Sequence, residues 1–394
     1  MKKVVILLLI ALPLAMYAQK PIKPNLNKAL SSWKAGKLQE AKEMIDVCTA
    51  DPKLSLDAKA WYYRGLIYAS LDTTSNATFK ALASNSFATS MEAFAKSAEL
   101  NKNSKNEIFY TDDMGLPVLK TQSMAYLGSY YLNAGAVAYQ DDDYETALTN
   151  FAKTQAILPG DTTAYFYAGF VANADEKYDL ALTNLTKYNS LGGKSSDAYS
   201  LIINIYGGPK QDKNKALEIT REAKKKFPNE KNFALMEIGY LIDLEKTEEA
   251  KGGLEQAVKD DPSNKTLHFY LGYVNSKLDK FDDAKKNFEA ALKLDPTYFD
   301  AQYYLAQLYL IEADKIKREM NNLGISAADK KKKVELDAEL VKRYKDALPY
   351  WEKAEKLNPS DTDVLDKLSI IYYYLGEDAK AARVEKRLKE LGIE

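Results

Sequence analysis

A spacing of 34 residues recurs along this chain of 394 residues. The clearest copy is Leu271-Gly272, Ala284, Phe288, Ala291 and Pro296. The copy that lies 34 residues before it has Glu237, Ala250, Leu254, Ala257 and Pro262 at the same positions. Two further copies lie upstream in the same frame. They are Ala134-Gly135, Ala147, Phe151 and Pro159, and then Ala168-Gly169, Ala181, Leu185 and Gly193. Internal repetition at this spacing predicts stacked supersecondary units in place of one globular core.

The residue types within one copy indicate a pair of antiparallel helices. Small residues recur in both halves of the unit, where two packed helix axes must come closest. The phenylalanine or leucine between the alanines fills the remaining gap, and the proline ends the second helix. Because one such pair cannot bury its own apolar face, neighbouring pairs must stack.

These residues match the tetratricopeptide pattern, and the chain resembles that family over most of its length. The resemblance implies an all-α solenoid of antiparallel helix pairs. The frame places repeats at 128–161, 162–195, 196–230, 231–264 and 265–298, with one extra residue in the third copy after Gly207-Gly208-Pro209. A further unit begins at Phe299 and a last one at Thr362.

Residues 19–127 follow the pattern poorly and are expected to form divergent helical repeats. Leu38 and Ala41 belong to an opening helix pair, and Trp61, Gly65 and Tyr68 fit the first helix of a second unit. The Ser-, Thr- and Asn-rich stretch 72–85 predicts a loop before a helix near Ser86 to Leu100. The stretch 101–127, which contains Pro117, fits no repeat.

The unit at 299–361 carries an insertion of about 312–344, because the alanine expected at position 318 occurs at Ala347. Gly324 interrupts an otherwise helical stretch, and Ser326 to Asp329 reads as a capping box that opens a new helix. A protruding helical hairpin is therefore expected, with Glu339 and Arg343 paired on its surface. The predicted seam is Val334, Ala338, Val341 and Leu348 facing Ile316, Met320 and Leu323. Residues 362–394 are expected to form the last repeat and its capping helices.

The N-terminus has the pattern of a secretory signal peptide at 1–18, with two lysines, an uncharged apolar run and a cut near Ala18. We expect an exported protein, of periplasmic location in a Gram-negative type of cell. No cysteine lies at the expected cut, so no lipid anchor is expected, and no later run is long enough for a membrane span. The formal charge of −1 argues against nucleic acid and against adhesion to a membrane surface by charge.

We find no pattern that predicts catalysis, a metal site or a cofactor. His268 is the only histidine and Cys48 the only cysteine, and both occupy positions where the repeat packs a side chain. Asp141 to Asp143 and Asp282-Asp283 precede second helices, where negative charge is stabilising. The Gly192-Gly193 and Gly207-Gly208 pairs end helices, and Lys330 to Lys333 is interpreted as a solvated face of the hairpin.

The resemblance also implies a concave face lined by the first helices. The residues that it places there are aromatic: Phe166, Tyr167, Phe170, Phe269, Tyr270, Tyr273, Tyr303, Tyr304, Tyr373 and Tyr374. The Lys, Asn and Arg set with which some family members clamp a C-terminal carboxylate is absent. Aromatic side chains suit a helical or extended peptide segment. The alternative is that these rings pack one repeat against the next.

The sequence therefore predicts a non-enzymatic scaffold that binds a protein or peptide through the aromatic groove, the hairpin or both. One alternative is a structural or accessory subunit of an envelope or secretion assembly, with the hairpin as a fixed docking element. Another is a glycan-binding subunit, against which the missing lipid-anchor cysteine counts. Nucleic acid is not expected as a partner.

Overall fold

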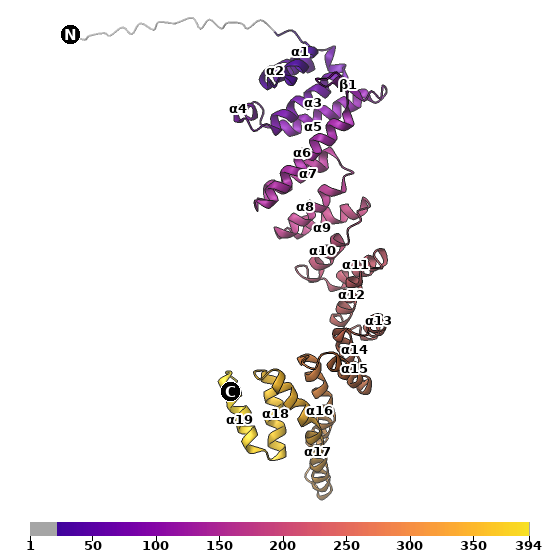
Figure 1. The fold of residues 1–394 in the computed structure, drawn as a ribbon, viewed down its shortest axis with the longest axis vertical. Helices are drawn as coiled ribbons and strands as arrows, with labels where there is room; N and C mark the ends of the chain where they lie inside the picture. Colours follow the sequence, from indigo (N-terminus) through magenta and orange to yellow (C-terminus); the bar gives the residue numbers. More distant parts are fainter. Residues whose placement is uncertain (1–21, 394) are drawn as a thin grey trace, which may run out of the picture. The chain divides into compact units, whose positions relative to one another are not determined.

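The computed structural model describes residues 22–393, so the expected signal peptide at 1–18 lies outside the described residues. Within that range the chain forms 19 α-helices, one short 3-10 turn and one two-stranded sheet, which confirms the predicted all-α class (Figure 1). The chain divides into two compact units, one ending at Asp175 and the other beginning at Glu176. We describe each unit by itself.

Unit 1 contains the divergent repeats and the start of the regular ones. Its helices and strands are α1 (Leu26–Lys34), α2 (Leu38–Ala50), η1 (Leu54–Leu56), α3 (Ala58–Thr73), α4 (Ala77–Lys80), α5 (Ser86–Asn101), β1 (Ile108–Thr111), β2 (Pro117–Leu119), α6 (Lys120–Gln140), α7 (Tyr144–Ile157) and α8 (Thr162–Ala174). The predicted helix near Ser86 is confirmed as α5. The expected loop at 72–85 also contains the single helical turn α4.

Unit 2 consists of helices only. These are α9 (Tyr178–Ser190), α10 (Ser196–Gly207), α11 (Lys213–Lys226), α12 (Lys231–Asp243), α13 (Thr247–Asp260), α14 (Lys265–Lys277), α15 (Phe281–Leu294), α16 (Phe299–Asn322), α17 (Ala327–Leu357), α18 (Thr362–Leu375) and α19 (Asp378–Glu390). The repeats expected at 196–230, 231–264 and 265–298 each coincide with one helix pair.

Helix starts follow from side chains that cap free backbone N–H groups. Asp143 accepts a hydrogen bond from the Thr146 N–H at 3.0 Å, which explains the Asp141 to Asp143 cluster by capping. The bonds from Thr146 lower the pKa of the Asp143 carboxyl. Further caps of this kind are Asn25, Asp57, Asp161, Ser195, Asp212, Asn264 and Asp361.

Close approach of paired helices explains the glycine in the pattern. In three pairs a Cβ added to this glycine would lie 2.4 to 2.7 Å from a phenylalanine ring carbon of the second helix: Gly65 with Phe94, Gly135 with Phe151, and Gly272 with Phe288. Any larger residue would force the ring away. The loop at 72–85 lies between Gly65 and Phe94, so these two residues are further apart in sequence than in the other pairs, but they make the same contact.

The turn inside each helix pair also repeats. One residue in each turn has a left-handed backbone conformation, at Asp142, Glu176, Gln211, Glu245 and Asp279. The steps between them are 34, 35, 34 and 34 residues, and the longer step falls in the copy expected to hold one extra residue. The repeat frame is therefore visible in the backbone as well as in the sequence.

The predicted helical hairpin is confirmed as α16 and α17, which extend together to a free end (Figure 1). Ser326 Oγ accepts from the Asp329 N–H at 3.1 Å, and the Asp329 carboxylate accepts from the Ser326 N–H at 3.3 Å, which completes the capping box. Arg343 pairs with Glu339 at 3.2 Å.

The predicted seam of this hairpin is confirmed in α16, where Ile316, Met320 and Leu323 lie in or against the core. It is largely wrong in α17, where only Leu348 of the four predicted residues packs against that core. Val334 is 72% exposed, and Ala338 is also exposed. The buried residues of α17 share a core with Leu310, Ala313 and Ile316 of α16, and they are Leu336, Leu340, Tyr344, Ala347, Trp351 and Ala354. The physical reason is helical periodicity: Leu336 is about three full turns before the buried Ala347 and lies on the same side of the helix, whereas Val334 lies on the opposite side.

A β-hairpin fills the stretch that matched no repeat. Ile108 pairs with Leu119 and Thr111 with Pro117 in antiparallel register, and Gly115 with φ of +82° lies in the connecting turn. The Tyr63 hydroxyl of α3 donates to the Phe109 carbonyl at 2.8 Å, so β1 is fixed on the helices of unit 1. After this hairpin α6 begins at Lys120, eight residues before the expected repeat boundary at 128.

Candidate functional site

The structure separates the ten predicted groove residues by their exposure. Tyr167, Phe170, Tyr270 and Tyr373 are exposed, and Tyr373 reaches 73%. Phe269 is buried at 8%. The remaining five are half-buried: Phe166, Tyr273, Tyr303, Tyr304 and Tyr374.

Most of the less exposed rings in unit 2 pack one helix against another. The Phe269 ring lies 5.6 Å from that of Tyr304, and Tyr304 meets Tyr273 edge-on at 5.3 Å. The Tyr303 hydroxyl donates to the Asp363 carboxylate, and the Tyr374 ring lies 5.1 Å from that of Tyr344. For these residues, the packing alternative describes what the side chains do in the structure.

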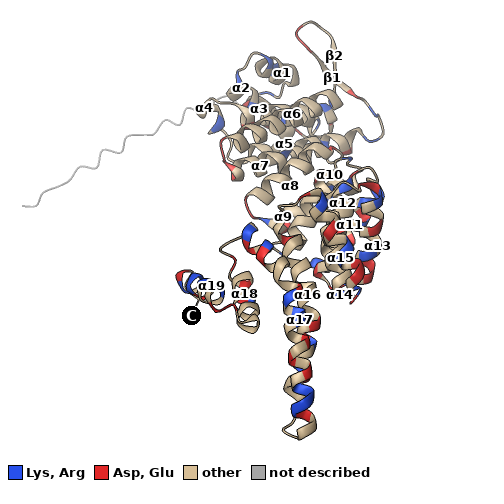
Figure 2. Cartoon of the chain, turned by 60° about the horizontal axis from the view of Figure 1, so that its bottom comes forward, with Lys and Arg blue, Asp and Glu red and all other residues tan. Residues whose placement is uncertain are grey.

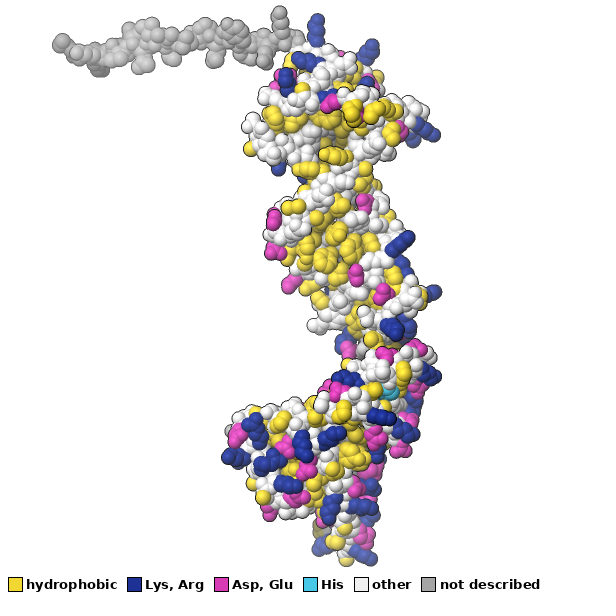
Figure 3. Space-filling model, viewed as in Figure 1, with side chains coloured by type: hydrophobic (Ala, Val, Ile, Leu, Met, Phe, Trp, Pro, Cys, Tyr) yellow, Lys and Arg dark blue, Asp and Glu magenta, His cyan; other side chains and the backbone are white. Residues whose placement is uncertain are grey.

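The face with the least charge lies in unit 1, on α6 and α8. No Asp, Glu, Lys or Arg occurs from Thr121 to Gln140 or from Thr162 to Ala174, although 28% of the whole chain is charged. On α6, Tyr126 is 81% exposed, and Tyr130 and Val137 are exposed further along the same side of the helix. On α8 the exposed apolar residues are Tyr167 and Phe170. Figure 3 shows hydrophobic side chains on the viewed face along these helices.

Ring contacts hold this face in place. The Tyr139 ring of α6 meets the Phe170 ring of α8 edge-on at 5.7 Å, which joins the two helices. Tyr167 stacks on the buried Phe151 at 6.1 Å. The Tyr130 hydroxyl donates to the Thr73 carbonyl at 2.9 Å. Pre-organised aromatic side chains of this kind lose little conformational entropy on binding.

Beneath this face a polar cluster fixes α6 and α7 to α3. The Tyr131 hydroxyl donates to the Asp72 carboxylate at 2.6 Å, and Lys153 Nζ lies 2.6 Å from the same carboxylate. Burial, and then the hydrogen bond to Asp72, raise the pKa of Tyr131. The charges of Asp72 and Lys153 are thus paired with each other.

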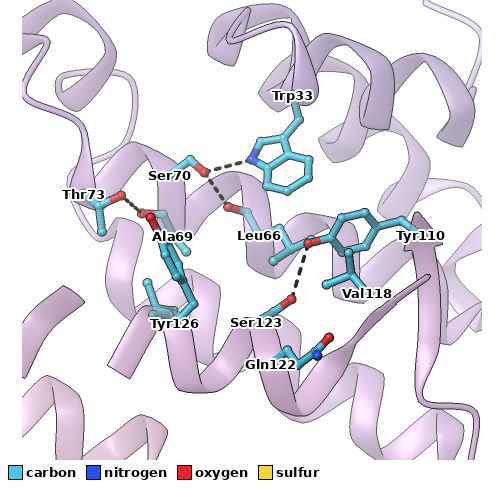
Figure 4. Close-up of a pocket in the computed structure, with 11 residues that line it drawn as sticks. Trp33, Leu66, Ala69, Ser70, Thr73, Tyr110, Val118, Gln122, Ser123 and Tyr126 are labelled. Carbon is cyan, nitrogen blue, oxygen red and sulfur yellow. Dashed lines mark hydrogen bonds between the residues drawn. The ribbon is translucent and has the colours of Figure 1, made fainter. Parts of the chain in front are cut away.

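A pocket of about 420 Å³ adjoins the α6 stripe, with Tyr126 at its rim. Its walls come from α1, α3, the β-hairpin and α6, and Figure 4 shows the rings of Trp33, Tyr110 and Tyr126 around the same hollow. None of its lining residues is charged: Trp33, Leu66, Ala69, Ser70, Thr73, Tyr110, Val118, Gln122, Ser123, Tyr126 and Leu127.

Hydrogen bonds set the shape of this pocket. Trp33 Nε1 donates to Ser70 Oγ at 2.8 Å, and the Trp33 and Tyr110 rings meet edge-on at 5.6 Å. The Tyr110 hydroxyl and Ser123 Oγ lie 3.4 Å apart. The walls are apolar surfaces with hydroxyl groups between them, an arrangement that suits an uncharged group with an apolar body.

Sequence reasoning missed this pocket and the exposed residues of α6. The missed signal was the charge-free run from Thr121 to Gln140, which is unusual for a helix with an exposed face. Tyr126 also lies before residue 128, where the repeat frame was expected to begin. Tyr110, on strand β1, contacts both Trp33 of α1 and Ser123 of α6, so the pocket forms only once the β-hairpin is in place.

The single histidine and the single cysteine are both engaged in local packing or hydrogen bonding. His268 Nε2 lies 2.9 Å from the Pro262 carbonyl oxygen, and Cys48 is buried at 0% exposure. Burial raises the pKa of the Cys48 thiol. Among residues 22–393, no group of three or more His, Cys, Asp or Glu side chains is placed to hold a metal ion.

None of the helices formed by residues 22–393 has both the length and the apolar character needed to cross a membrane.

Comparisons with known proteins point to one repeat family. The family model for the tetratricopeptide repeat matches residues 266–298, which form α14 and α15. A search of curated proteins finds no significant match.

Several solved structures are similar in part. A TPR-repeat protein from Cytophaga hutchinsonii, solved for its C-terminal part, is 17% identical over 66% of this chain and 95% of its own, with a TM-score of 0.48. YrrB, described as a TPR protein with an unusual peptide-binding site, is 18% identical over 54% of this chain and 98% of its own, with a TM-score of 0.38. MamA is 16% identical over 43% and 92%, with a TM-score of 0.38. Similarities this low carry no argument about ligands.

The matched repeat shares its features with the other helix pairs. The glycine–phenylalanine contact at Gly272 recurs at Gly65 and Gly135, and the left-handed turn residue recurs at steps of 34 or 35. The chain therefore contains a tetratricopeptide repeat at residues 266–298, within a series of helix pairs that share its features.

Proposed function

We propose that this chain is a scaffold without catalytic function, which binds an uncharged, apolar segment of a protein partner along α6 and α8. The observation that carries the proposal is the exposed stripe of Tyr126, Tyr130, Val137, Tyr167 and Phe170 on two helices that have no charge from Thr121 to Gln140 and from Thr162 to Ala174. Contiguous exposed apolar surface of this kind typically marks an interaction site.

The pocket beside Tyr126 supplies an anchor point for such a segment. Its volume of about 420 Å³ lies within the usual range of ligand pockets, and its walls are uncharged. A partner side chain with an apolar body would bury its surface against Trp33, Tyr110 and Tyr126, which line the pocket. Interfaces commonly draw most of their affinity from a few such anchors.

The absence of charge also defines the partner. A charged side chain placed on this face would lose hydration without gaining an ion pair, because the nearby Asp72 and Lys153 are paired with each other. We therefore expect a segment rich in Leu, Phe, Tyr or Pro and poor in Asp, Glu, Lys and Arg. Export to the periplasm, supported by the pattern of residues 1–18, would place this scaffold in the cell envelope.

A random peptide library displayed on phage tests the proposal. We expect the full mature chain to select uncharged, aromatic or aliphatic peptides. The affinity of a selected peptide, measured by fluorescence polarisation, should fall about tenfold or more in a Tyr126→Ser, Tyr167→Ser double variant, because large aromatic anchors typically contribute over 1 kcal/mol each.

Tyr373→Ser is the matched control, because Tyr373 is a similarly exposed tyrosine on α18 of unit 2. It should leave the affinity unchanged. The proposal fails if the selected peptides are highly charged, or if the double variant binds them as well as the parent chain does. A loss of affinity only in Tyr373→Ser would move the site to unit 2.

A further inference from the structure

The free end of the α16–α17 hairpin has a local charge that the whole-chain value hides. We define the hairpin tip as residues 318–334. It contains five basic residues, Arg318 and Lys330 to Lys333, and two acidic residues, Glu319 and Asp329, for a local charge of 5 − 2 = +3. The whole chain has a charge of −1. Figure 2 shows the basic segments near this end of the hairpin.

The two acidic residues of the tip are already engaged, and the next two along α17, Glu335 and Asp337, lie beyond the lysines on the side away from the free end. Asp329 forms the capping box with Ser326, and Glu319 lies 3.6 Å from Lys332. Lys330, Lys331 and Lys333 are exposed, and no ion pair to them occurs within the described part of the chain. The start of α17 adds the positive end of a helix dipole at the same place.

Apolar side chains are exposed at the same end. Ile325, in the loop between the two helices, is 90% exposed, and Val334 is 72% exposed. No side chain from 318 to 334 is fully buried, so the tip contributes little to the core of unit 2. Moving the exposed Ile325 side chain from water into an apolar environment would be favourable.

The arrangement of the lysines decides which kind of partner fits. Four consecutive helical residues, at about 100° each, spread their side chains over most of the helix circumference. A protein groove would contact one side of the helix and use only some of them. A flat anionic surface met by the end of the hairpin can attract all four, because they lie within about 10 Å of the start of α17.

We propose that the hairpin tip binds the surface of an anionic phospholipid membrane end-on. Ile325 enters the boundary between headgroups and acyl chains, while Lys330 to Lys333 lie against the lipid phosphates. The exposed isoleucine favours a lipid surface over a nucleic acid, whose phosphate backbone offers no apolar layer at the same depth. A basic cluster joined to an apolar insertion is a known physical basis for reversible membrane association.

This inference is independent of the proposed peptide site, because the tip belongs to unit 2 and the site to unit 1. The whole-chain charge of −1 argues against adhesion of the molecule as a whole by charge, and the hairpin tip is a local exception. Screening at physiological ionic strength limits electrostatic attraction to about 8 Å, so the local charge at the tip determines the interaction.

Vesicle flotation with the full mature chain tests the inference. We expect binding to phosphatidylcholine vesicles that contain about a third phosphatidylglycerol, and weak binding to phosphatidylcholine alone. Each lysine near such a surface is worth about fivefold in binding. Replacing all of Lys330 to Lys333 by glutamine should therefore lower partitioning more than about 50-fold, and Ile325→Ser should lower it about tenfold.

The matched control replaces four scattered, exposed lysines of unit 1 by glutamine and so changes the net charge equally: Lys28, Lys53, Lys80 and Lys102. It should retain binding. Circular dichroism should show the same helix content in every variant, because the tip residues are not buried.

Three results would overturn the inference. The first is a parent chain that binds neither kind of vesicle, and the second is an equal loss of binding in the scattered-lysine control. The third is unchanged binding of Ile325→Ser together with full competition by polyglutamate, which would assign the tip to an acidic protein surface instead. None of these results would affect the peptide-binding test.

Discussion

At the scale of single residues, the turn inside each helix pair requires one residue with a positive φ, and the type of residue found there gives little indication of it. Asp142, Glu176, Gln211, Glu245 and Asp279 adopt the left-handed conformation without being glycine. Such a conformation costs an ordinary residue about 1 kcal/mol. Only the first pair and the last use glycine there, at Gly36 and Gly376.

Two glycines should therefore respond in opposite ways to the same substitution. Gly376→Ala should destabilise unit 2 by about 1 kcal/mol, because φ is +71° at that position. Gly252→Ala should stabilise it by about 0.8 kcal/mol, because Gly252 lies inside α13 and an added Cβ meets no atom within 4 Å. Urea unfolding followed by circular dichroism measures both changes. A stabilising effect of Gly376→Ala would contradict the turn assignment.

The lone thiol belongs to the packing and should be chemically silent. Cys48 is buried against the apolar cluster of α2 and α3, and burial raises its pKa. A thiol reagent such as dithionitrobenzoate should react with the native chain at less than about 1% of the rate seen in denaturant, because reaction requires an exposed thiolate. Rapid reaction of the native chain would indicate that α2 is poorly packed.

At the scale of helices and strands, the repeat pattern predicted the helix pairs well because each depends on local contacts. The glycine opposite phenylalanine, as at Gly272 and Phe288, is a requirement that the sequence displays directly. The hairpin was predicted for a similar reason, since Gly324 and the capping box at Ser326 mark its turn.

The sequence analysis was wrong about part of the hairpin seam, and it missed the β-hairpin and the pocket. Val334 was placed in the hairpin seam by its spacing to Ala338, Val341 and Leu348, whereas counting back from Ala347 would have selected Leu340 and Leu336. The β-hairpin has strands of four and three residues, too short for a readable alternation. The pocket could not be predicted at all, because Trp33 and Tyr110 are far apart in sequence and meet only in the folded unit.

Shortening the hairpin should leave unit 2 folded. We expect that replacing Lys317 to Lys342 by about five Gly and Ser residues retains cooperative unfolding, because Tyr344, Ala347 and Trp351 remain to pack in the core. Leu336 and Leu340 would be lost, so the melting temperature should fall by a few degrees. Thermal unfolding by circular dichroism provides the measurement. Loss of the cooperative transition would show that the arms are part of the repeat core and not an addition to it.

At the scale of the whole molecule, average properties hide the features that matter for function. A net charge of −1 and 28% charged residues are ordinary average values for a protein. The same chain has a charge-free stretch from Thr121 to Gln140 and a tip with a local charge of +3. A scaffold gains specificity from such uneven distribution, since its repeats share one fold and differ mainly in their surfaces.

Export is a prediction for the intact molecule in its cell. The pattern of residues 1–18 predicts cleavage after Ala18, so the mature chain should begin at Gln19. N-terminal sequencing of the protein from separated cell fractions checks both the cut and the location. An uncut chain that begins at Met1 and remains in the cytosolic fraction would refute the prediction.

The central claim is that a protein partner lies on the charge-free face of unit 1, and site-specific photo-cross-linking tests it most directly. A photoreactive phenylalanine derivative would replace Tyr126 in one variant and Tyr373 in another, both produced in the native cell. We predict a discrete protein adduct at position 126 and none at position 373. Adducts at position 373 alone, or at neither position, would contradict the claim.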